Sequence, residues 1–241
     1  MQVQEFVYPG HDIPLVEAYG ERFESVFVVL HPFVRVPGSL AWNSVQSYPT
    51  DEEILAHGTK CPWAEVMKQT GITSYAGMSQ ALLTAIGSLD DDLADWATRD
   101  SIESLAKTHP VWMPAEGRFE PLLQQDFLGV FESAGQKELI FVPEFPHADP
   151  VVRLPTDGLK NGSVPFPSRG TLLAPDQSFL FTVDWDSFFT LFYGTSAFVT
   201  ESARRLGLEG FFATPNTEHA WFNYSFGCAT VTVSPEDWPG E

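Results

Sequence analysis

The sequence predicts an α+β fold in which a central mixed β-sheet is covered by helices that come mainly from the N-terminal half. Three observations favour this class. Short apolar runs of strand length recur along the chain, helical periodicity with capping signals fills residues 50–133, and 44% of the 241 residues are apolar, which is enough for a sizeable core. The 20 Phe and 7 Trp residues indicate that aromatic rings fill much of that core.

The densest apolar pattern begins at residues 178–185. Side chains alternate between the two faces of a strand, so one face of this segment would carry four apolar residues, Phe179, Phe181, Val183 and Trp185. Asp186 either continues the strand or caps a short helix at residues 187–193. A second strand through the same aromatic run is the other possibility.

Four further strands complete the predicted sheet, because each is a short run rich in β-branched or aromatic residues. They are residues 26–30, 138–142, 209–213 and 229–233. A helix is expected before the third of these. It begins at Thr195 or Ser196 and ends at Gly207, which suits the left-handed position after a helix.

The helical region at residues 50–133 carries recognisable start and stop signals. Thr50 and Glu53 fit a capping box. Pro62 suits the first position of a helix that Gly71 would close. We expect one α+β domain over residues 1–241. The Pro- and Gly-rich residues 143–170 are either a subdomain boundary or a long ordered excursion over the surface.

The formal net charge of −19 narrows the classes of partner. Nucleic acids and anionic membrane surfaces both reward clustered Lys and Arg, so neither is expected as a partner. A basic protein partner is permitted, because complementary charge speeds encounter. The same charge also serves solubility alone.

Compartment and processing signals are few. The N-terminus has neither a basic start nor an apolar core, so no signal peptide is predicted, and no apolar run reaches the ~20 residues that span a bilayer. A cytoplasmic location is therefore expected. The two cysteines, Cys61 and Cys228, have no metal-site spacing. Two reduced buried thiols are the simplest account, and a disulfide between them is the alternative.

The sharpest candidate site combines three carboxylates and one imidazole: Asp184, Asp186, Glu209 and His219. If their strands are neighbours, these groups could serve as general acid and base or bind a hard divalent cation. A structural role for each is the competing hypothesis: Asp186 as a helix cap, Asp184 as an acceptor for a loop, and Glu209 paired with Arg204 or Arg205. The chain has no metal-site spacing, no phosphate-binding loop and no nucleophile elbow, so no metal site and no cofactor are assigned.

A group of residues in the last third resembles a family of uncharacterised bacterial proteins, a domain-of-unknown-function family. The residues that carry the resemblance are Asp184, Trp185, Asp186, Phe188, Phe189, Glu209, Gly210, Phe211, Phe212, His219 and Trp221. By analogy, similar small acidic α+β proteins act as binding or immunity proteins in defence loci. The leading functional hypothesis is thus a non-enzymatic cytoplasmic protein-binding module. The alternative is a hydrolase-like enzyme that uses the Asp/Glu/His cluster.

Overall fold

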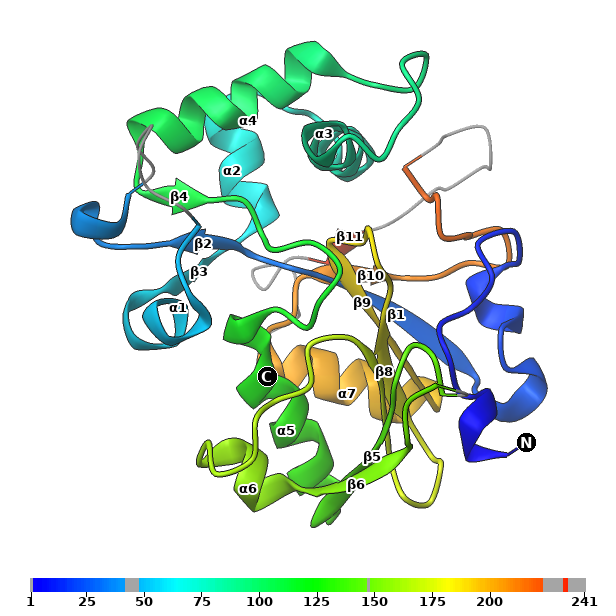
Figure 1. Cartoon of the computed structure of the whole chain (residues 1–241). Coiled ribbons are helices and arrows are strands. Elements are labelled where there is room, and N and C mark those ends of the chain that lie inside the picture. The colour runs from blue at the N-terminus through cyan, green and yellow to red at the C-terminus, as the bar shows by residue number, and fades with distance from the viewer. Residues whose placement is uncertain (1, 42–47, 147, 223–231, 234–241) are drawn as a thin grey trace.

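The structure is a computed structural model that describes residues 2–41, 48–146, 148–222 and 232–233. It confirms the α+β class (Figure 1). The α-helices are α1 (Asp51–His57), α2 (Trp63–Thr70), α3 (Tyr75–Ile86), α4 (Trp96–Thr108), α5 (Gln124–Ser133), α6 (Thr156–Lys160) and α7 (Ser196–Leu206). The strands are β1 (Ser25–Leu30), β2 (Phe33–Arg35), β3 (Thr59–Cys61), β4 (Val111–Trp112), β5 (Glu138–Val142), β6 (Val152–Pro155), β7 (Gly170–Leu173), β8 (Leu180–Val183), β9 (Phe189–Gly194), β10 (Gly210–Phe212) and β11 (Thr232–Val233).

The large sheet has the strand order β11-β10-β1-β9-β8-β7-β5-β6, and a small sheet has the order β3-β2-β4. All pairings among the described strands are antiparallel, so the parallel component of the expected mixed sheet is not found there. The connection through α7 explains why no parallel pair forms here. It carries the chain from β9 to β10, which run in the same direction, but β1 lies between these two strands and pairs antiparallel with both.

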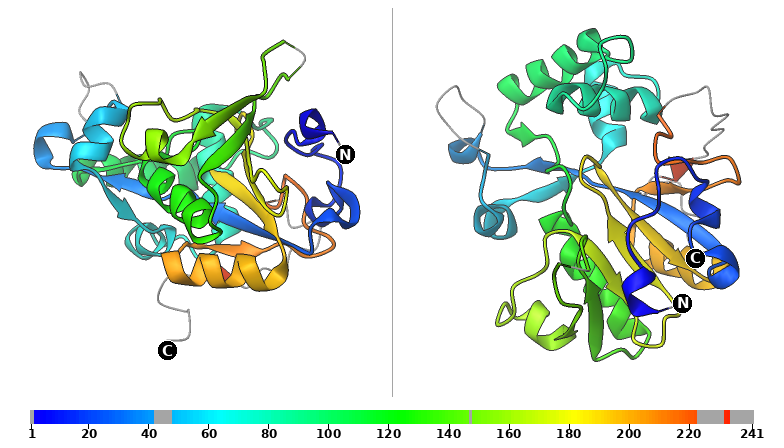
Figure 2. Two further views of the ribbon diagram at one scale, coloured as in Figure 1. Left: turned by 90° about the horizontal axis from the view of Figure 1, so that it is seen from below. Right: turned by 45° about the vertical axis from the view of Figure 1, so that its right-hand side comes forward.

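Strand β1 divides the interior into two apolar clusters, one on each face of the sheet. Val26 and Val28 pack into the cluster that also contains Trp63 of α2 and Met78 of α3. Phe27, on the opposite face, packs with side chains of α5 and α7. Figure 2 shows α7 lying along one side of the sheet, and Figure 1 shows α2, α3 and α4 grouped at the top of the molecule. The central strands β1, β7, β8 and β9 are therefore buried on both faces, which is why they read as largely apolar runs, whereas the edge strand β6 is partly exposed.

Four of the predicted strands correspond to β1, β5, β8 and β10. Only residues 232–233 of the predicted strand 229–233 are described, as β11; the remainder lies outside the described residues. The helix considered for residues 187–193 is wrong, because β9 occupies Phe189–Gly194 and all six of its residues are buried. Within the Pro- and Gly-rich residues 143–170, β6 and α6 form. The strands that flank this stretch, β5 and β7, pair directly with each other.

The helix signals at residues 50–133 are largely confirmed. Thr50 and Glu53 form the capping box of α1, and Gly71 ends α2 in the left-handed conformation. Thr195 is the N-cap of α7, and Gly207 ends that helix with a φ of 59°. In the part of the chain that the structure describes, no helix combines the length and the apolar character needed to cross a bilayer.

Candidate metal centre

Two of the four predicted site residues meet at one end of the sheet. The imidazole Nε2 of His219 lies 3.8 Å from Oδ2 of Asp184. Both side chains are 14% exposed, so they sit at a partly covered surface. Asp186 is in the turn that follows Asp184, while Glu209 lies elsewhere in the fold and makes other contacts.

Two residues from the N-terminal segment complete the cluster. The Nε2 atom of His11 is 2.6 Å from Oδ2 of Asp184, and the His11 ring stacks on that of His219 with centroids 3.9 Å apart and an angle of 6° between the planes. The Tyr8 hydroxyl forms a 2.9 Å hydrogen bond with Nδ1 of His219. Three segments that are far apart in the sequence thus supply one constellation. We refer to His11, Asp184 and His219 as the His-Asp-His cluster.

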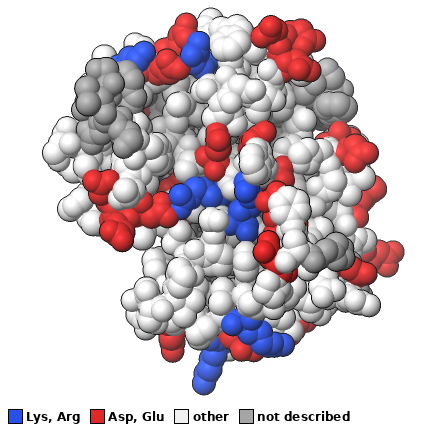
Figure 3. Space-filling model, viewed as in Figure 1, with Lys and Arg blue, Asp and Glu red and all other residues white. Residues whose placement is uncertain are grey.

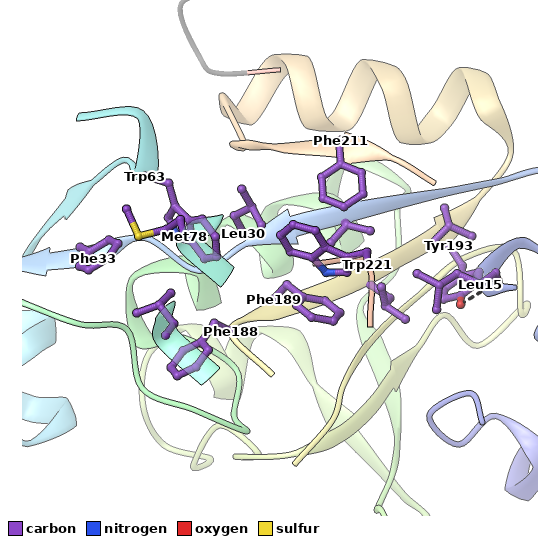
Figure 4. Packing of buried hydrophobic residues seen from close by; sticks show 14 of the residues in the cluster. Leu15, Leu30, Phe33, Trp63, Met78, Phe188, Phe189, Tyr193, Phe211 and Trp221 are labelled. Atoms are coloured by element: carbon purple, nitrogen blue, oxygen red, sulfur yellow. Dashed lines mark hydrogen bonds between the residues drawn. The ribbon is translucent and has the colours of Figure 1, made fainter. Parts of the chain in front are cut away.

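The N-terminal segment is tied to the loop that carries His219. The amide of Leu15 donates a 2.8 Å hydrogen bond to the carbonyl of Thr217. The Tyr193 hydroxyl, from β9, donates a 3.0 Å bond to the carbonyl of Leu15, drawn as a dashed line in Figure 4. Leu15 and Tyr193 are both buried. These bonds hold the segment with Tyr8 and His11 against the sheet.

The His219 loop has its own anchors. Thr214 and Thr217 exchange backbone and hydroxyl hydrogen bonds of 2.9 to 3.0 Å, which form a tight turn. Beyond it, the Trp221 ring is buried edge-on against Phe211 of β10 and Phe189 of β9, with centroid distances of 4.9 and 5.9 Å (Figure 4). His219 is thus held between a turn and a buried aromatic side chain.

Asp184 lies in the turn that joins β8 to β9. The Ser187 hydroxyl donates a 3.0 Å hydrogen bond to the Asp184 carbonyl. The Gly117 amide in turn donates a 3.0 Å bond to the Ser187 carbonyl. Gly117 has a φ of 61°, and a Cβ placed on it would lie 1.7 Å from the Trp185 carbonyl oxygen. Only glycine allows this close approach, so the 112–118 segment supports the Asp184 turn.

Burial dominates the electrostatics of the site. Burial, and secondly the neighbouring His11 imidazole, lowers the pKa of His219 to about 4, although the Asp184 carboxylate acts in the opposite direction. His219 is therefore neutral at pH 7. Burial also raises the pKa of Asp186, with the Asp184 carboxylate as the next cause. Glu116 has a raised pKa for the same first reason, and Asp186 raises it further.

Glu209 serves a different part of the molecule. Its carboxylate accepts hydrogen bonds from the Trp63 and Ala64 amides at the N-terminus of α2, at 2.7 and 2.9 Å. The Tyr75 hydroxyl donates a third bond of 3.1 Å. These three bonds come from α2 and α3, whereas the sequence predicted an ion pair between Glu209 and Arg204 or Arg205. A buried carboxylate at a helix N-terminus satisfies free amides and interacts favourably with the helix dipole.

The His-Asp-His cluster has the donor set and the spacing of a metal site. One ligand atom from each of His11, Asp184 and His219 can be chosen so that all three lie within 4.8 Å of one another. Imidazole nitrogens with one carboxylate oxygen suit Zn²⁺ and other divalent transition metals. No sequence motif pointed to His11 or Tyr8, since both lie in a turn-rich N-terminal segment whose position only the folded chain determines.

The fold and the site together define an antiparallel α+β protein with a two-histidine, one-aspartate cluster at the end of its large sheet. The family comparison agrees with the expected class of protein. Residues 11–223 match the model described as "Protein of unknown function (DUF2711)", and the chain belongs to that family. The matched range includes all three residues of the His-Asp-His cluster.

The chain is also similar to the "Uncharacterized protein YwbB" of Bacillus subtilis (strain 168). The two are 21% identical over 227 residues, which cover 90% of this chain and 99% of the relative. No solved structure matches the chain significantly.

Proposed function

We propose that the protein binds one divalent transition-metal ion, Zn²⁺ in the first instance, through His11, Asp184 and His219, and that it acts as a metal-dependent, hydrolase-like enzyme. The observation that carries the proposal is the convergence of three ligand atoms, from three separate segments, within 4.8 Å of one another. The anchors described above hold each segment in place.

The number of protein ligands supports a catalytic type of site. Structural zinc sites have four protein ligands, whereas catalytic sites have three and leave a position for water or substrate. The His11 side chain is 61% exposed, so the cluster opens to solvent on that side. A metal held there would keep room for a water molecule and would lower the pKa of that water towards neutrality.

The protonation state of His219 also favours metal binding. Histidine binds metals as the neutral imidazole, and the lowered pKa keeps His219 in that form at pH 7. The bond between Tyr8 and Nδ1 orients the ring and leaves Nε2 on the Asp184 side. Partners of this kind orient metal ligands and raise their affinity. Asp186 follows Asp184 in the same turn, and its raised pKa would suit it to act as a general base beside a metal held by the cluster.

Metal titration of the chelator-treated protein tests the proposal. We expect isothermal titration calorimetry with ZnCl₂ to give one site per chain and the melting temperature to rise with metal concentration. The variants His11→Ala, Asp184→Asn and His219→Ala should each weaken binding at least tenfold. His57→Ala, which alters an exposed histidine in the last turn of α1, is the matched control. Absence of stoichiometric binding, or equal affinity in all four variants, would overturn the assignment.

A second candidate function follows from the short contact between His11 and Asp184. A carboxylate 2.6 Å from Nε2 orients the imidazole, and Nδ1 has no bond to another residue in the described part of the chain. General bases use such an arrangement without a metal. This version predicts a hydrolase-like activity that survives chelation. The metal version predicts that chelation abolishes the activity and that added Zn²⁺ restores it.

The protein-binding hypothesis rests on the net charge and on the analogy with small acidic α+β binding and immunity proteins. Figure 3 shows acidic groups scattered over one face of the molecule, with basic groups near its centre and at its upper and lower edges, and the net charge is −19. A basic protein partner, an immunity-like role and a cytoplasmic location stay predictions. A pull-down that recovers a basic protein at 0.15 M salt and loses it at 0.5 M salt would support the first of them, because salt screens exposed charges.

A further inference from the structure

A pocket of about 430 Å³ lies between the helical layer and the segment that follows β4, and it is lined by other residues than those of the His-Asp-His cluster. Its volume is in the range of small-molecule sites. Its walls come from the end of α3, from α4, from Tyr48 and from the segment that begins at Trp112. The lining residues are Tyr48, Ile86, Glu103, Ala106, Lys107, Trp112, Met113, Pro114, Ala115 and Glu116.

The pocket is apolar in its interior, and two aromatic rings form one wall. The rings of Tyr48 and Trp112 meet edge to face, with centroids 5.5 Å apart. Their polar atoms are already used, because the Tyr48 hydroxyl bonds the Met113 carbonyl and the Trp112 indole nitrogen bonds the Leu40 carbonyl. These rings therefore offer hydrocarbon and π surface to a ligand.

The two glutamates that line the pocket, Glu103 and Glu116, differ in their ion pairs. Glu103 is paired with Arg99 at 2.8 Å and with Lys107 at 3.5 Å, all within α4. Glu116, by contrast, forms no ion pair with any residue that the structure describes. The Glu116 side chain is exposed at the edge of the pocket, and partial desolvation, followed by the carboxylate of Asp186, raises its pKa. A cation placed beside Glu116 would relieve that repulsion.

We propose that this pocket binds a small organic cation with an apolar body, an aryl-alkyl or alkyl ammonium, whose charged end pairs with Glu116 and whose body contacts Trp112 and Tyr48. Charge complementarity and the aromatic wall argue for this ligand class. Aromatic faces attract ammonium groups as well as hydrocarbon, and a charge-assisted hydrogen bond to a carboxylate is stronger than a neutral one. The net charge of −19 raises the local concentration of such cations.

Binding of three matched probes tests the proposal: 2-phenylethylammonium, the neutral 2-phenylethanol and the anionic 3-phenylpropionate. The measurement is calorimetry with the chelator-treated full-length protein at pH 7.5. We expect saturable binding of the ammonium probe, with at least tenfold weaker binding of the other two, because only the ammonium forms the charge-assisted bond.

Two variants locate the ligand. Glu116→Gln should weaken the ammonium probe about tenfold and leave the neutral probe unchanged. Ala106→Phe should fill the apolar part of the pocket and exclude every probe. Glu52→Gln, at an exposed position of α1, is the control for general charge loss and should bind as the wild type does.

Three outcomes would overturn the proposal: no saturable binding of the ammonium probe, equal affinity for the charged and neutral probes, or an unaltered affinity in Glu116→Gln. Because the chelator removes any metal ion, this result is independent of the proposed metal centre. Zinc binding with no amine binding would end only the pocket proposal, and amine binding with no zinc binding would end only the metal proposal.

Discussion

The imidazole rings of His11 and His219 lie in a parallel stack 3.9 Å apart, and both direct Nε2 to the same carboxylate oxygen of Asp184. Two protonated rings at this separation would repel each other strongly, and the lowered pKa of His219 reflects part of that repulsion. A metal ion bound by both nitrogens would keep both rings neutral. Because such an ion lies close to the plane of each imidazole that binds it, the rings would have to turn out of the parallel stack to bind it together.

Tyr8→Phe should weaken zinc binding by about 10- to 100-fold, the effect typical of losing a group that orients a metal ligand. The substitution removes only the hydroxyl that bonds Nδ1 of His219. Calorimetry with ZnCl₂ measures the affinity. Circular dichroism should show an unchanged fold, and Tyr48→Phe, which removes a hydroxyl that bonds the Met113 carbonyl, should leave zinc affinity unaltered. Wild-type affinity in Tyr8→Phe would argue that His219 is not a ligand.

Gly117→Ala should displace the turn that carries Asp184, because the new methyl group would lie 1.7 Å from the Trp185 carbonyl oxygen. We expect a loss of zinc binding together with a lower melting temperature. Gly135→Ala is the matched control. Gly135 also has a positive φ, of 72°, but nothing lies within 4 Å of its added Cβ, so this variant should lose only the ~1 kcal/mol of a left-handed alanine and keep its zinc affinity. Similar effects in both variants would contradict the proposed role of this contact.

Glu209→Gln should reduce the free energy of unfolding by about 2 kcal/mol, since it replaces a buried carboxylate that accepts three hydrogen bonds. Urea denaturation measures the change, and Glu17→Gln, at an exposed position, is the control. Zinc affinity should stay as in the wild type, because Glu209 supports α2 and not the His-Asp-His cluster. A selective loss of zinc binding would return Glu209 to the candidate site.

Glu120 should make the protein less stable as the pH rises from about 4.5 to about 7. It is completely buried, and neither carboxylate oxygen has a hydrogen-bond partner of good geometry among the residues that the structure describes. Burial raises its pKa from 4.5 to about 7, although the amides of Leu122 and Ala115 and the Arg118 guanidinium act against burial. Between these two pH values the folded state holds the proton and the unfolded state releases it, so the free energy of unfolding falls by about 3 kcal/mol across this window.

Glu120→Gln removes this titration and gives the test. Its stability relative to the wild type should improve steadily as the pH rises from 4.5 to 7 and should change little outside that range. Urea denaturation at half-unit pH intervals measures the difference. A constant difference across the window would mean that the carboxyl group ionises normally in the folded protein.

Part of the candidate site could be predicted from the sequence. Asp184 follows an alternating apolar strand, which places it at a strand end, and His219 follows a polar loop before the buried Trp221. The structure places Glu209 outside this cluster. Its carboxylate accepts hydrogen bonds from the Trp63 and Ala64 amides and the Tyr75 hydroxyl. Nothing near residue 209 in the sequence indicates a contact with a helix terminus that is so distant along the chain.

The sequence by itself determined the local structure of this protein. The capping box at Thr50, the left-handed glycines after α2 and α7 and the apolar strands follow from hydrogen bonding and backbone sterics between residues that are neighbours in the chain. Only the tertiary structure decided which loops meet. The cluster of His11, Asp184 and His219 exists because Leu15 is bonded to Thr217 and Tyr193, and because Gly117 admits the Trp185 carbonyl. Such long-range contacts leave no periodic pattern in the sequence, because they form only when the completed sheet brings its connecting segments together.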